Sequence, residues 1–229
     1  MPRITQPLKY HGGKHYLAGR IIALIPEHVH YVEPYAGGLA VLLAKDPEGY
    51  SELVNDLDGE LMNFWRVLQG EETFARFRRI VEAFPLSRGA WQAAHDQRQT
   101  GADPVADAVA FFVDCRQSLA GRRQGFTAIS RTRTRRRMNG NVSEWLGAVE
   151  GLPAVHTRLK RVVVECGPAL EVIRREDTPG TLFYLDPPYL LEKLGGVYKE
   201  DMMLHEHEEL LELLQSVKGK VILSGYHSK

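Results

Sequence analysis

Cysteine is scarce in this sequence, and long apolar runs are missing. The chain has 229 residues and 2 cysteines, and Cys115 and Cys166 stand too far apart for a metal-binding motif. We interpret both as reduced thiols. No run of about 18 or more apolar residues is present, and no signal-peptide pattern is found. These absences argue against a disulfide-stabilised scaffold and a membrane protein, and we expect a cytoplasmic protein.

A net charge is also lacking, because 29 lysines and arginines balance 29 aspartates and glutamates. The balance hides a segregation along the chain. Eight arginines and no acidic residue lie between Arg116 and Arg137, whereas residues 186–214 hold eight acidic residues and two lysines. This asymmetry says more about binding partners than the neutral total does.

Short runs rich in β-branched and aromatic residues alternate with helical patterns. Gly, Pro or Asp bounds each run, as expected for strands. Regular alternation of strands and helices predicts an open, doubly wound α/β sheet. The predicted strands are residues 30–35, 52–56, 161–165, 181–186 and 220–225, and the predicted helices between them are 13–26, 38–45 and 168–177.

The hundred residues from 58 to 160 break this alternation. Apolar residues recur there with the i, i+3, i+4, i+7 spacing of amphipathic helices, and no strand is predicted. We therefore expect a discontinuous α/β domain, formed by residues 1–57 and 161–229, and a mostly helical inserted domain at 58–160.

The stretch "YVEPYAGGLAVLL" (31–43) predicts a strand, a tight turn and a helix. Such a turn brings backbone N–H groups close to a ligand at the carboxyl end of a strand. A plain tight turn is an equal alternative until Asp56 is considered. Asp56 ends the next predicted strand, where a carboxylate can accept hydrogen bonds from ribose hydroxyls. The two features together predict a nucleoside site.

Two other motifs do not predict a ligand site. "KYHGGK" (9–14) lacks the Ser or Thr and the glycine spacing of a phosphate-binding loop, so use of ATP or GTP is not expected. The His-x-His pairs could in principle ligate a metal. His205 and His207, however, lie on different faces of a predicted helix. The two pairs are His28 with His30 and His205 with His207. We interpret these histidines as surface residues and expect no metal.

The stretch Asp186-Pro187-Pro188-Tyr189 ends the fourth predicted strand. As structure alone, it is a strand terminator with a buried tyrosine. As a site, Asp186 and the carbonyl of Pro187 can each accept one hydrogen from a planar NH₂ group. Tyr189 can stack on the ring that carries this amine. The arrangement predicts group transfer to the exocyclic amine of a base lifted out of its stack.

Taken in order, these motifs resemble the Dam-type adenine-specific DNA methyltransferases. The resemblance is carried by "LKYHGGK", "VEPYAGG", "VNDLDGELMNFWRVL" and "FYLDPPY", with a helical insert before the last. It implies S-adenosylmethionine as methyl donor, a Rossmann-like methyltransferase sheet and a target-recognition role for the insert. It implies no metal.

The resemblance also implies roles for individual residues. Two departures are visible: Leu39 stands where the family commonly has a glycine, and Cys166-Gly167-Pro168 replaces an acidic residue that faces the cofactor adenine. The adenine pocket is therefore unassigned. The implied roles are cofactor contact by Tyr10 and Lys14, the methionine-side turn by Glu33, Tyr35 and Gly37, ribose binding by Asp56, and placement of Asp186 between cofactor and target amine.

The arginine-rich stretch 122–141 has no helical apolar face and predicts a hairpin or loop. Arginines in such a position suit phosphates and guanine edges, and a solvated basic loop is the alternative. On an extended strand, residues 131, 133 and 135 share one side, which we expect to meet DNA. The DNA-binding candidates are Arg122, Arg123, Arg131, Arg133, Arg135, Arg136 and Arg137.

We therefore expect a site-specific DNA methyltransferase that acts on the exocyclic amine of a flipped adenine in double-stranded DNA. A cognate restriction enzyme is a compatible partner. The alternatives are a methyltransferase acting on RNA or on a protein glutamine, and a DNA-binding relative with impaired catalysis.

Overall fold

The computed structural model describes residues 4–10, 13–97, 101–189 and 202–225. Within these ranges five parallel strands form one sheet, in the order β5-β2-β1-β6-β7. The chain order reverses between the central strands β1 and β6, which is where ligands bind in open α/β sheets. The strands are β1 (His30–Glu33), β2 (Ser51–Asp56), β5 (Val163–Cys166), β6 (Thr181–Leu185) and β7 (Lys220–Leu223).

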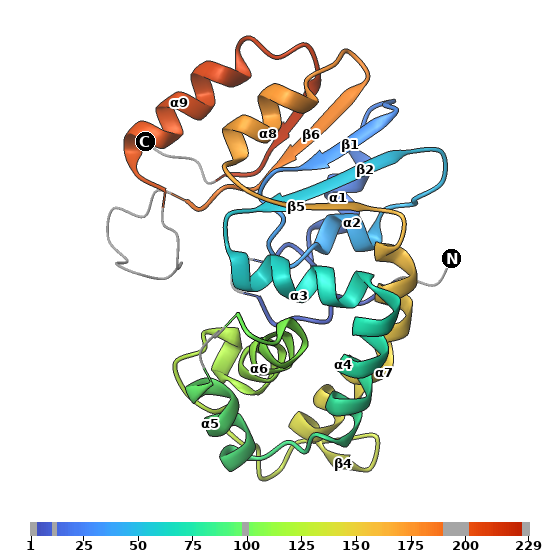
Figure 1. The fold of residues 1–229 in the computed structure, drawn as a ribbon, viewed down its shortest axis with the longest axis vertical. Helices are drawn as coiled ribbons and strands as arrows, with labels where there is room; N and C mark the ends of the chain where they lie inside the picture. The colour runs from blue at the N-terminus through green and yellow to red at the C-terminus, as the bar shows by residue number, and fades with distance from the viewer. Residues whose placement is uncertain (1–3, 11–12, 98–100, 190–201, 226–229) are drawn as a thin grey trace.

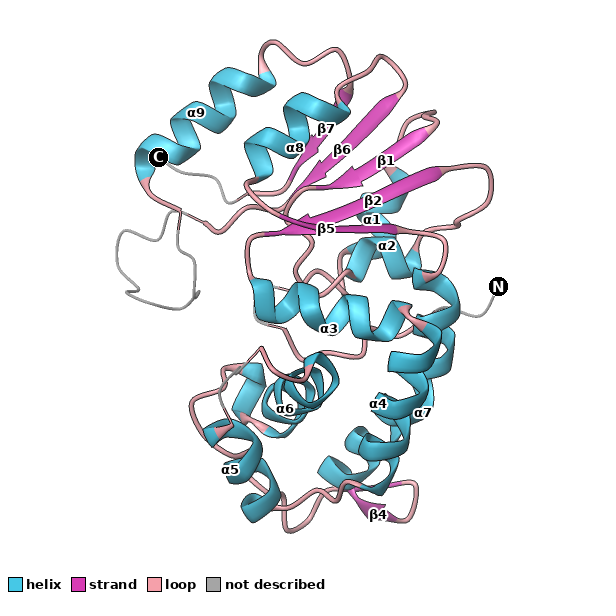
Figure 2. Cartoon of the chain, viewed as in Figure 1, coloured by secondary structure: helices cyan, strands magenta, loops and turns pink. Residues whose placement is uncertain are grey.

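Helices cover both faces of this sheet, as Figure 2 shows. Because successive side chains of a strand point to opposite faces, Tyr31 and Val54 pack on one side of the sheet and Val32 and Leu53 on the other. The predicted doubly wound α/β class is confirmed. On the first face lie α1 (Ala18–Ala23), α2 (Ala40–Ala44) and α3 (Gly59–Gln69), and on the second α8 (Ala169–Glu176) and α9 (Leu204–Leu214).

The predicted strands all exist, and their bounds differ from the predictions by at most two residues at either end. The first helix is shorter than the predicted 13–26, since it spans Ala18–Ala23. Beyond it, Leu24 and Ile25 donate to carbonyls three residues back, in the tighter geometry of a fraying helix end. Pro26 then disfavours the helical conformation of the residue before it.

The segment between β2 and β5 is mostly helical, as predicted, and forms the lower half of Figure 1. In the helix that begins at Pro104, Asp103 caps the backbone N–H groups of Val105 and Ala106. No helix in the described ranges is long and apolar enough to cross a bilayer. Besides α3, the segment contains α4 (Glu71–Ala83), α5 (Arg88–Asp96), α6 (Pro104–Gln117), η1 (Leu119–Gly121) and α7 (Gly140–Leu159).

The sheet and these helices share one hydrophobic core. Phe64 on α3 stacks on Phe112 of α6 with ring centroids 5.8 Å apart, and both belong to the cluster that contains Tyr31 of β1. A buried ion pair adds a polar link, since Arg158 of α7 donates to both oxygens of Glu52 on β2 at 2.6 and 2.8 Å. The domain boundaries at 57/58 and 160/161 stay a prediction.

The helical segment also contains a short hairpin within 122–141, where a hairpin or loop was predicted, although the periodicity over 58–160 predicted no strand. Thr134–Arg135 (β3) pairs with Met138–Asn139 (β4), and two-residue strands are too short to show an apolar alternation. The extended strand expected over 131–135 is wrong too, because residues 131–132 form a bend. Arg136 and Arg137 have φ values of 53° and 62°, as a tight two-residue hairpin turn requires.

Candidate active site

A cavity of about 360 Å³ opens at the carboxyl ends of the central strands, within the usual size range of small-molecule sites. It lies where β1 and β6 meet, at the reversal of strand order. Residues far apart in the chain converge on it. The structure brings together all the predicted catalytic and cofactor residues, which are Tyr10, Lys14, Glu33, Tyr35, Gly37, Asp56, Asp186, Pro187, Pro188 and Tyr189.

The turn after β1 forms one wall of the cavity. Gly37 has a φ of 47° and Leu39 a φ of 56°, both in the left-handed region. Leu39 therefore adopts the conformation that a glycine would adopt without strain, at a cost of about 1–2 kcal/mol. Its side chain is fully buried in the core, which offsets that cost. Leu39 thus takes a backbone conformation at this turn that glycine adopts readily.

Asp56 fixes this turn to the end of β2. Its Oδ2 accepts a hydrogen bond from the Gly37 N–H at 2.9 Å, and its Oδ1 accepts one from the Asp58 N–H at 3.1 Å. Burial raises the pKa of Asp56, and the two backbone hydrogen bonds oppose that rise. A carboxylate has about four acceptor positions, so Asp56 keeps capacity for hydroxyl groups on the cavity side.

Glu33 ends β1 and is almost fully buried. Burial raises its pKa to about 8, although a hydrogen bond from the Tyr31 hydroxyl at 2.7 Å opposes the shift. The nearby Asp186 carboxylate contributes to the rise. Glu33 is therefore mostly protonated at neutral pH unless a cation enters the cavity.

Asp186 follows β6 and has a partner on each carboxylate oxygen. Lys14 Nζ lies 2.8 Å from Oδ2, and the Tyr189 hydroxyl donates to Oδ1 at 2.9 Å. The same Lys14 Nζ lies 4.9 Å from the centroid of the Tyr189 ring. This triad places a carboxylate, an ammonium group and an aromatic ring at one point of the cavity, across 172 residues of sequence.

Several lining residues were not predicted from the sequence. Pro168, Ala169 and Leu170 follow β5 directly, so the strand-end rule that found Asp56 applies to them as well. Glu206 and Glu209 reach the cavity from α9, and their i, i+3 spacing signals a common helix face. The start of α8 and its N-cap Pro168 thus form a further wall of the cavity.

The lining is strongly acidic. Among the described residues that line the cavity, seven carry carboxyl groups and two, Lys14 and Arg174, are cationic. Such a surplus disfavours a phosphate-rich ligand and suits one that carries positive charge. No group of three metal-binding side chains is found in the described ranges.

The arginine candidates belong to the segment between β2 and β5 and fall into two groups. Arg123 pairs with Asp114 and Glu60 at 2.8 and 2.7 Å, and Arg136 forms a two-pronged pair with Glu150 at 2.9 Å. The other five side chains are exposed, namely Arg122, Arg131, Arg133, Arg135 and Arg137.

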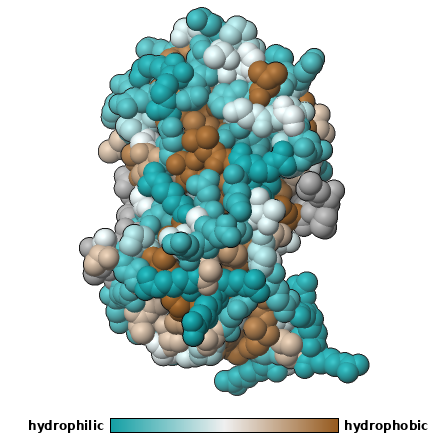
Figure 3. All heavy atoms as spheres, turned by 45° about the vertical axis from the view of Figure 1, so that its right-hand side comes forward, coloured by the Kyte–Doolittle hydropathy of each residue, from teal (hydrophilic) through white to brown (hydrophobic). Residues whose placement is uncertain are grey.

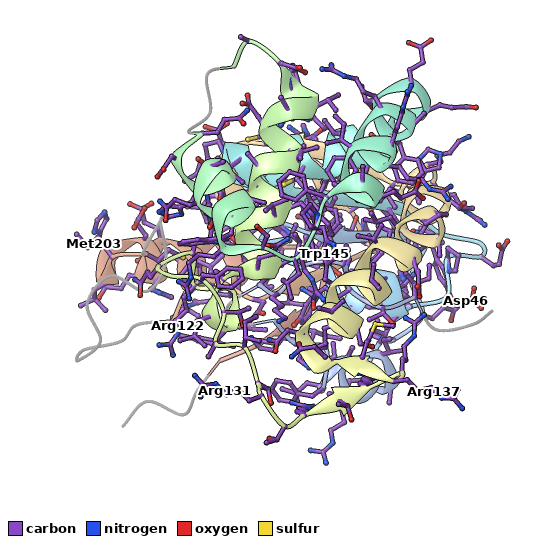
Figure 4. The ribbon with its side chains drawn as sticks, turned by 90° about the horizontal axis from the view of Figure 1, so that it is seen from below. Asp46, Arg122, Arg131, Arg137, Trp145 and Met203 are labelled. Carbon is purple, nitrogen blue, oxygen red and sulfur yellow. The ribbon has the colours of Figure 1, made fainter. Side chains whose placement is uncertain are left out.

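These arginines do not gather on one flat face. Figure 4 shows Arg131 and Arg137 projecting from opposite sides of residues 122–141, called the arginine segment below, while Trp145 lies in the interior. Figure 3 shows hydrophilic side chains projecting from the lower end of the molecule, beside hydrophobic atoms on the same end. The segment is therefore a projecting basic element rather than a patch.

Comparison with known proteins adds an independent finding. The sequence model of the D12 class N6 adenine-specific DNA methyltransferases matches residues 10–229. A 64-residue stretch is 39% identical to a protein of Escherichia phage P1 named "DNA N-6-adenine-methyltransferase". That stretch is 28% of this chain and covers 8% of the phage protein. Because the family match extends over nearly the whole sequence, the chain belongs to the D12 class N6 adenine-specific DNA methyltransferase family.

Proposed function

We propose that the protein transfers a methyl group from S-adenosylmethionine to the exocyclic amine of adenine in double-stranded DNA. The observation that carries the proposal is the position of Asp186-Pro187-Pro188-Tyr189 at the mouth of an acidic cavity. Family membership and the name of the phage relative support the same reaction.

The cavity residues fit this cofactor. When bound, S-adenosylmethionine supplies an electrophilic methyl group on a positively charged sulfur. The seven carboxyl groups of the lining favour such a cation over a phosphate ligand. The turn of Tyr35 and Gly37 would hold the methionine part, the free acceptor positions of Asp56 would take the ribose hydroxyls, and Pro168–Leu170 would border the adenine.

Asp186 and Pro187 would orient the target amine. Each oxygen accepts one amine hydrogen, so the nitrogen lone pair is directed away from both acceptors and towards the cofactor side. In the structure, Asp186 Oδ1 is taken by the Tyr189 hydroxyl and Oδ2 by Lys14. The entering amine would replace the tyrosine hydroxyl, and the released ring would stack on the base.

The exposed arginines would hold the DNA while an adenine leaves its stack. Phosphate contacts from this group fix position and supply affinity, and a guanidinium in the groove can read a guanine edge. The helical segment 58–160 would then act as the target-recognition domain. A restriction enzyme as partner rests on the family resemblance alone.

The test is product analysis by mass spectrometry. The protein is incubated with S-adenosylmethionine carrying a labelled methyl group and, separately, with duplex DNA, RNA and a glutamine-containing peptide. We expect labelled N6-methyladenine from the duplex. Methylcytosine, label only in RNA or peptide, or cofactor binding without transfer would overturn the proposal.

A further inference from the structure

The turn that precedes the arginine segment has an unusual backbone. Ala120, Gly121 and Arg123 all have positive φ values, of 54°, 72° and 56°. Alanine and arginine rarely adopt this conformation, so surrounding contacts must hold them in it. Residues 118–123, called the recognition turn below, connect α6 to the exposed arginines.

One set of contacts fixes the recognition turn to the segment that enters the cavity. At Gly121, a Cβ atom would lie 2.0 Å from the Lys9 carbonyl oxygen, so the two backbones touch directly. Lys9 also pairs with Glu144 of α7 at 3.1 Å. The next residue, Tyr10, lines the cavity. The recognition turn therefore lies one residue away from the cavity wall.

Arg123 supplies a second link. Its Nε donates to Asp114 Oδ2 at 2.8 Å, and its Nη1 donates to Glu60 Oε2 at 2.7 Å. Asp114 is buried and also accepts hydrogen bonds from Trp91 and His95 of α5. The guanidinium thus joins the recognition turn to α3 and α6, and Asp114 extends the link to α5.

The α3 end of this link borders the cavity. Glu60 lies in the first turn of α3. The helix is capped by Asp58, which lines the cavity together with Asp56 and Leu57. A helix turn is a rigid spacer of roughly 5 Å. The pair of Arg123 and Glu60 therefore ties the recognition turn to the first turn of α3, next to the cavity.

We propose that Arg123 is a positioning residue for methyl transfer, which holds the recognition turn against α3 so that bound DNA presents its adenine at Asp186. This inference rests on the proposed function and replaces the direct DNA contact expected for Arg123 from the sequence. The neighbouring Arg122 is exposed and makes no ion pair with another described residue, so it keeps the phosphate-binding role. Two adjacent arginines thus have different tasks.

The two roles give different kinetics. Removal of a phosphate-binding side chain lowers the salt slope of log affinity by about one unit and leaves the rate at saturating DNA unchanged. Removal of a positioning side chain leaves that slope unchanged and lowers kcat, because a misplacement of about 1 Å costs roughly a hundredfold in rate. Arg122→Gln and Arg123→Gln are therefore a matched pair of variants.

The experiment measures kcat at saturating duplex and S-adenosylmethionine, and duplex affinity at several salt concentrations. For Arg123→Gln we expect kcat to fall by roughly tenfold or more with an unchanged salt slope. For Arg122→Gln we expect the salt slope of log affinity to fall by about one unit, with kcat unchanged. Glu60→Gln should behave like Arg123→Gln, and because Glu60 is acidic, its effect cannot come from weaker phosphate binding. Arg123→Lys should restore part of kcat, since one ammonium group reaches one carboxylate.

Thermal unfolding of each variant gives the folded fraction by which rates are normalised. If Arg123→Gln does not fold, Glu60→Gln and Arg123→Lys carry the test. A reduced salt slope with unchanged kcat in Arg123→Gln would overturn the inference, as would wild-type behaviour of Glu60→Gln. If the wild-type protein transfers no methyl group to adenine, the proposed function itself is wrong. This outcome is seen before any variant is compared.

Discussion

The cavity and the arginine segment differ in charge and in how firmly their side chains are held. Around the cavity, Asp56, Glu33 and Asp186 each accept hydrogen bonds from groups fixed by the fold. Among the arginine candidates, by contrast, six of the seven are exposed, all but Arg123. Chemistry requires groups placed before the substrate arrives, whereas a polyanion is bound by charges that adapt to it. This difference supports the proposal that the cavity carries out catalysis and that the segment binds DNA.

Removal of the Asp186 carboxylate should have the largest effect. Asp186→Ala deletes the acceptor that orients the target amine, and we expect methyl transfer to fall below detection. Duplex affinity should stay close to that of the wild type, because Asp186 is not part of the arginine segment. Transfer assays with a labelled methyl group and duplex-binding assays on the same preparation check this. Undiminished transfer would remove Asp186 from the site.

Asp56→Ala should weaken cofactor binding by roughly 1.5–3 kcal/mol for each charge-assisted hydrogen bond that is removed. The substitution also leaves the Gly37 N–H without its acceptor, so Asp56→Asn is the milder control. Calorimetry with S-adenosylmethionine measures the affinity. Equal affinity in a folded Ala variant would show that Asp56 holds only the turn.

Glu33 should make stability depend on pH. Its folded-state pKa of about 8 lies above the usual value of 4.5, so the folded protein binds a proton that the unfolded chain releases. The resulting stability is fully present below about pH 4.5 and is lost as pH rises to about 8. At pH 7 the folded protein must therefore keep Glu33 protonated at a cost in free energy. Glu33→Gln removes this cost and should stabilise the protein by about 2–3 kcal/mol at pH 7.

Denaturant unfolding of wild type and Glu33→Gln between pH 5 and 8.5 measures the difference. We expect the gap between the two proteins to widen with pH. A constant gap would show that Glu33 is ionised in the folded protein. Saturating S-adenosylmethionine should narrow the gap, since a nearby cation favours the carboxylate.

Two substitutions at Tyr189 separate the stacking of its ring from the hydrogen bond of its hydroxyl group. Tyr189→Ala should lose roughly 1–3 kcal/mol of base stacking, visible as a higher half-saturating duplex concentration and slower transfer. Tyr189→Phe keeps the ring and frees Asp186 Oδ1, so its effect should be mild. A severe defect in the Phe variant would mean that the hydroxyl, rather than the ring, is required.

Single changes in the arginine segment should have the smallest effects. Removal of one phosphate-binding arginine should lower the salt slope of log affinity by about one unit for all sequences. Removal of a base-reading arginine should instead cost roughly 1–3 kcal/mol at one position of the site. Binding of cognate and scrambled duplexes at several salt concentrations distinguishes the two. The variants are single Gln substitutions at Arg122, Arg131, Arg133, Arg135 and Arg137, with Arg136→Gln as the paired control.

Local signals in the sequence predicted the elements well, and distant contacts were beyond their reach. Apolar runs bounded by Gly, Pro or Asp marked every strand of the sheet. The pairing of Lys14 with Asp186 joins residues 172 positions apart. No local pattern encodes such a contact, and the same holds for Arg123 with Glu60.

The turn at Arg136 and Arg137 shows another limit. Tight hairpin turns usually carry Asn or Gly, and two arginines in the left-handed region give no such signal. The residues after β5 are a different case, because Pro168–Leu170 line the cavity and follow a strand end just as Asp56 does. The sequence therefore contains the signal for this wall of the cavity, although it does not show which part of a ligand the wall would touch.

The division of labour between cavity and arginine segment is tested most directly by the rate of methyl transfer as a function of duplex concentration. The protein to use is the quadruple variant in which Gln replaces Arg131, Arg133, Arg135 and Arg137. With four exposed cationic side chains removed, the half-saturating duplex concentration should rise by roughly tenfold or more at moderate salt. The rate at saturation should stay within about threefold of wild type, because the cavity is untouched. A collapse of the saturating rate with an unchanged half-saturating concentration would contradict the account.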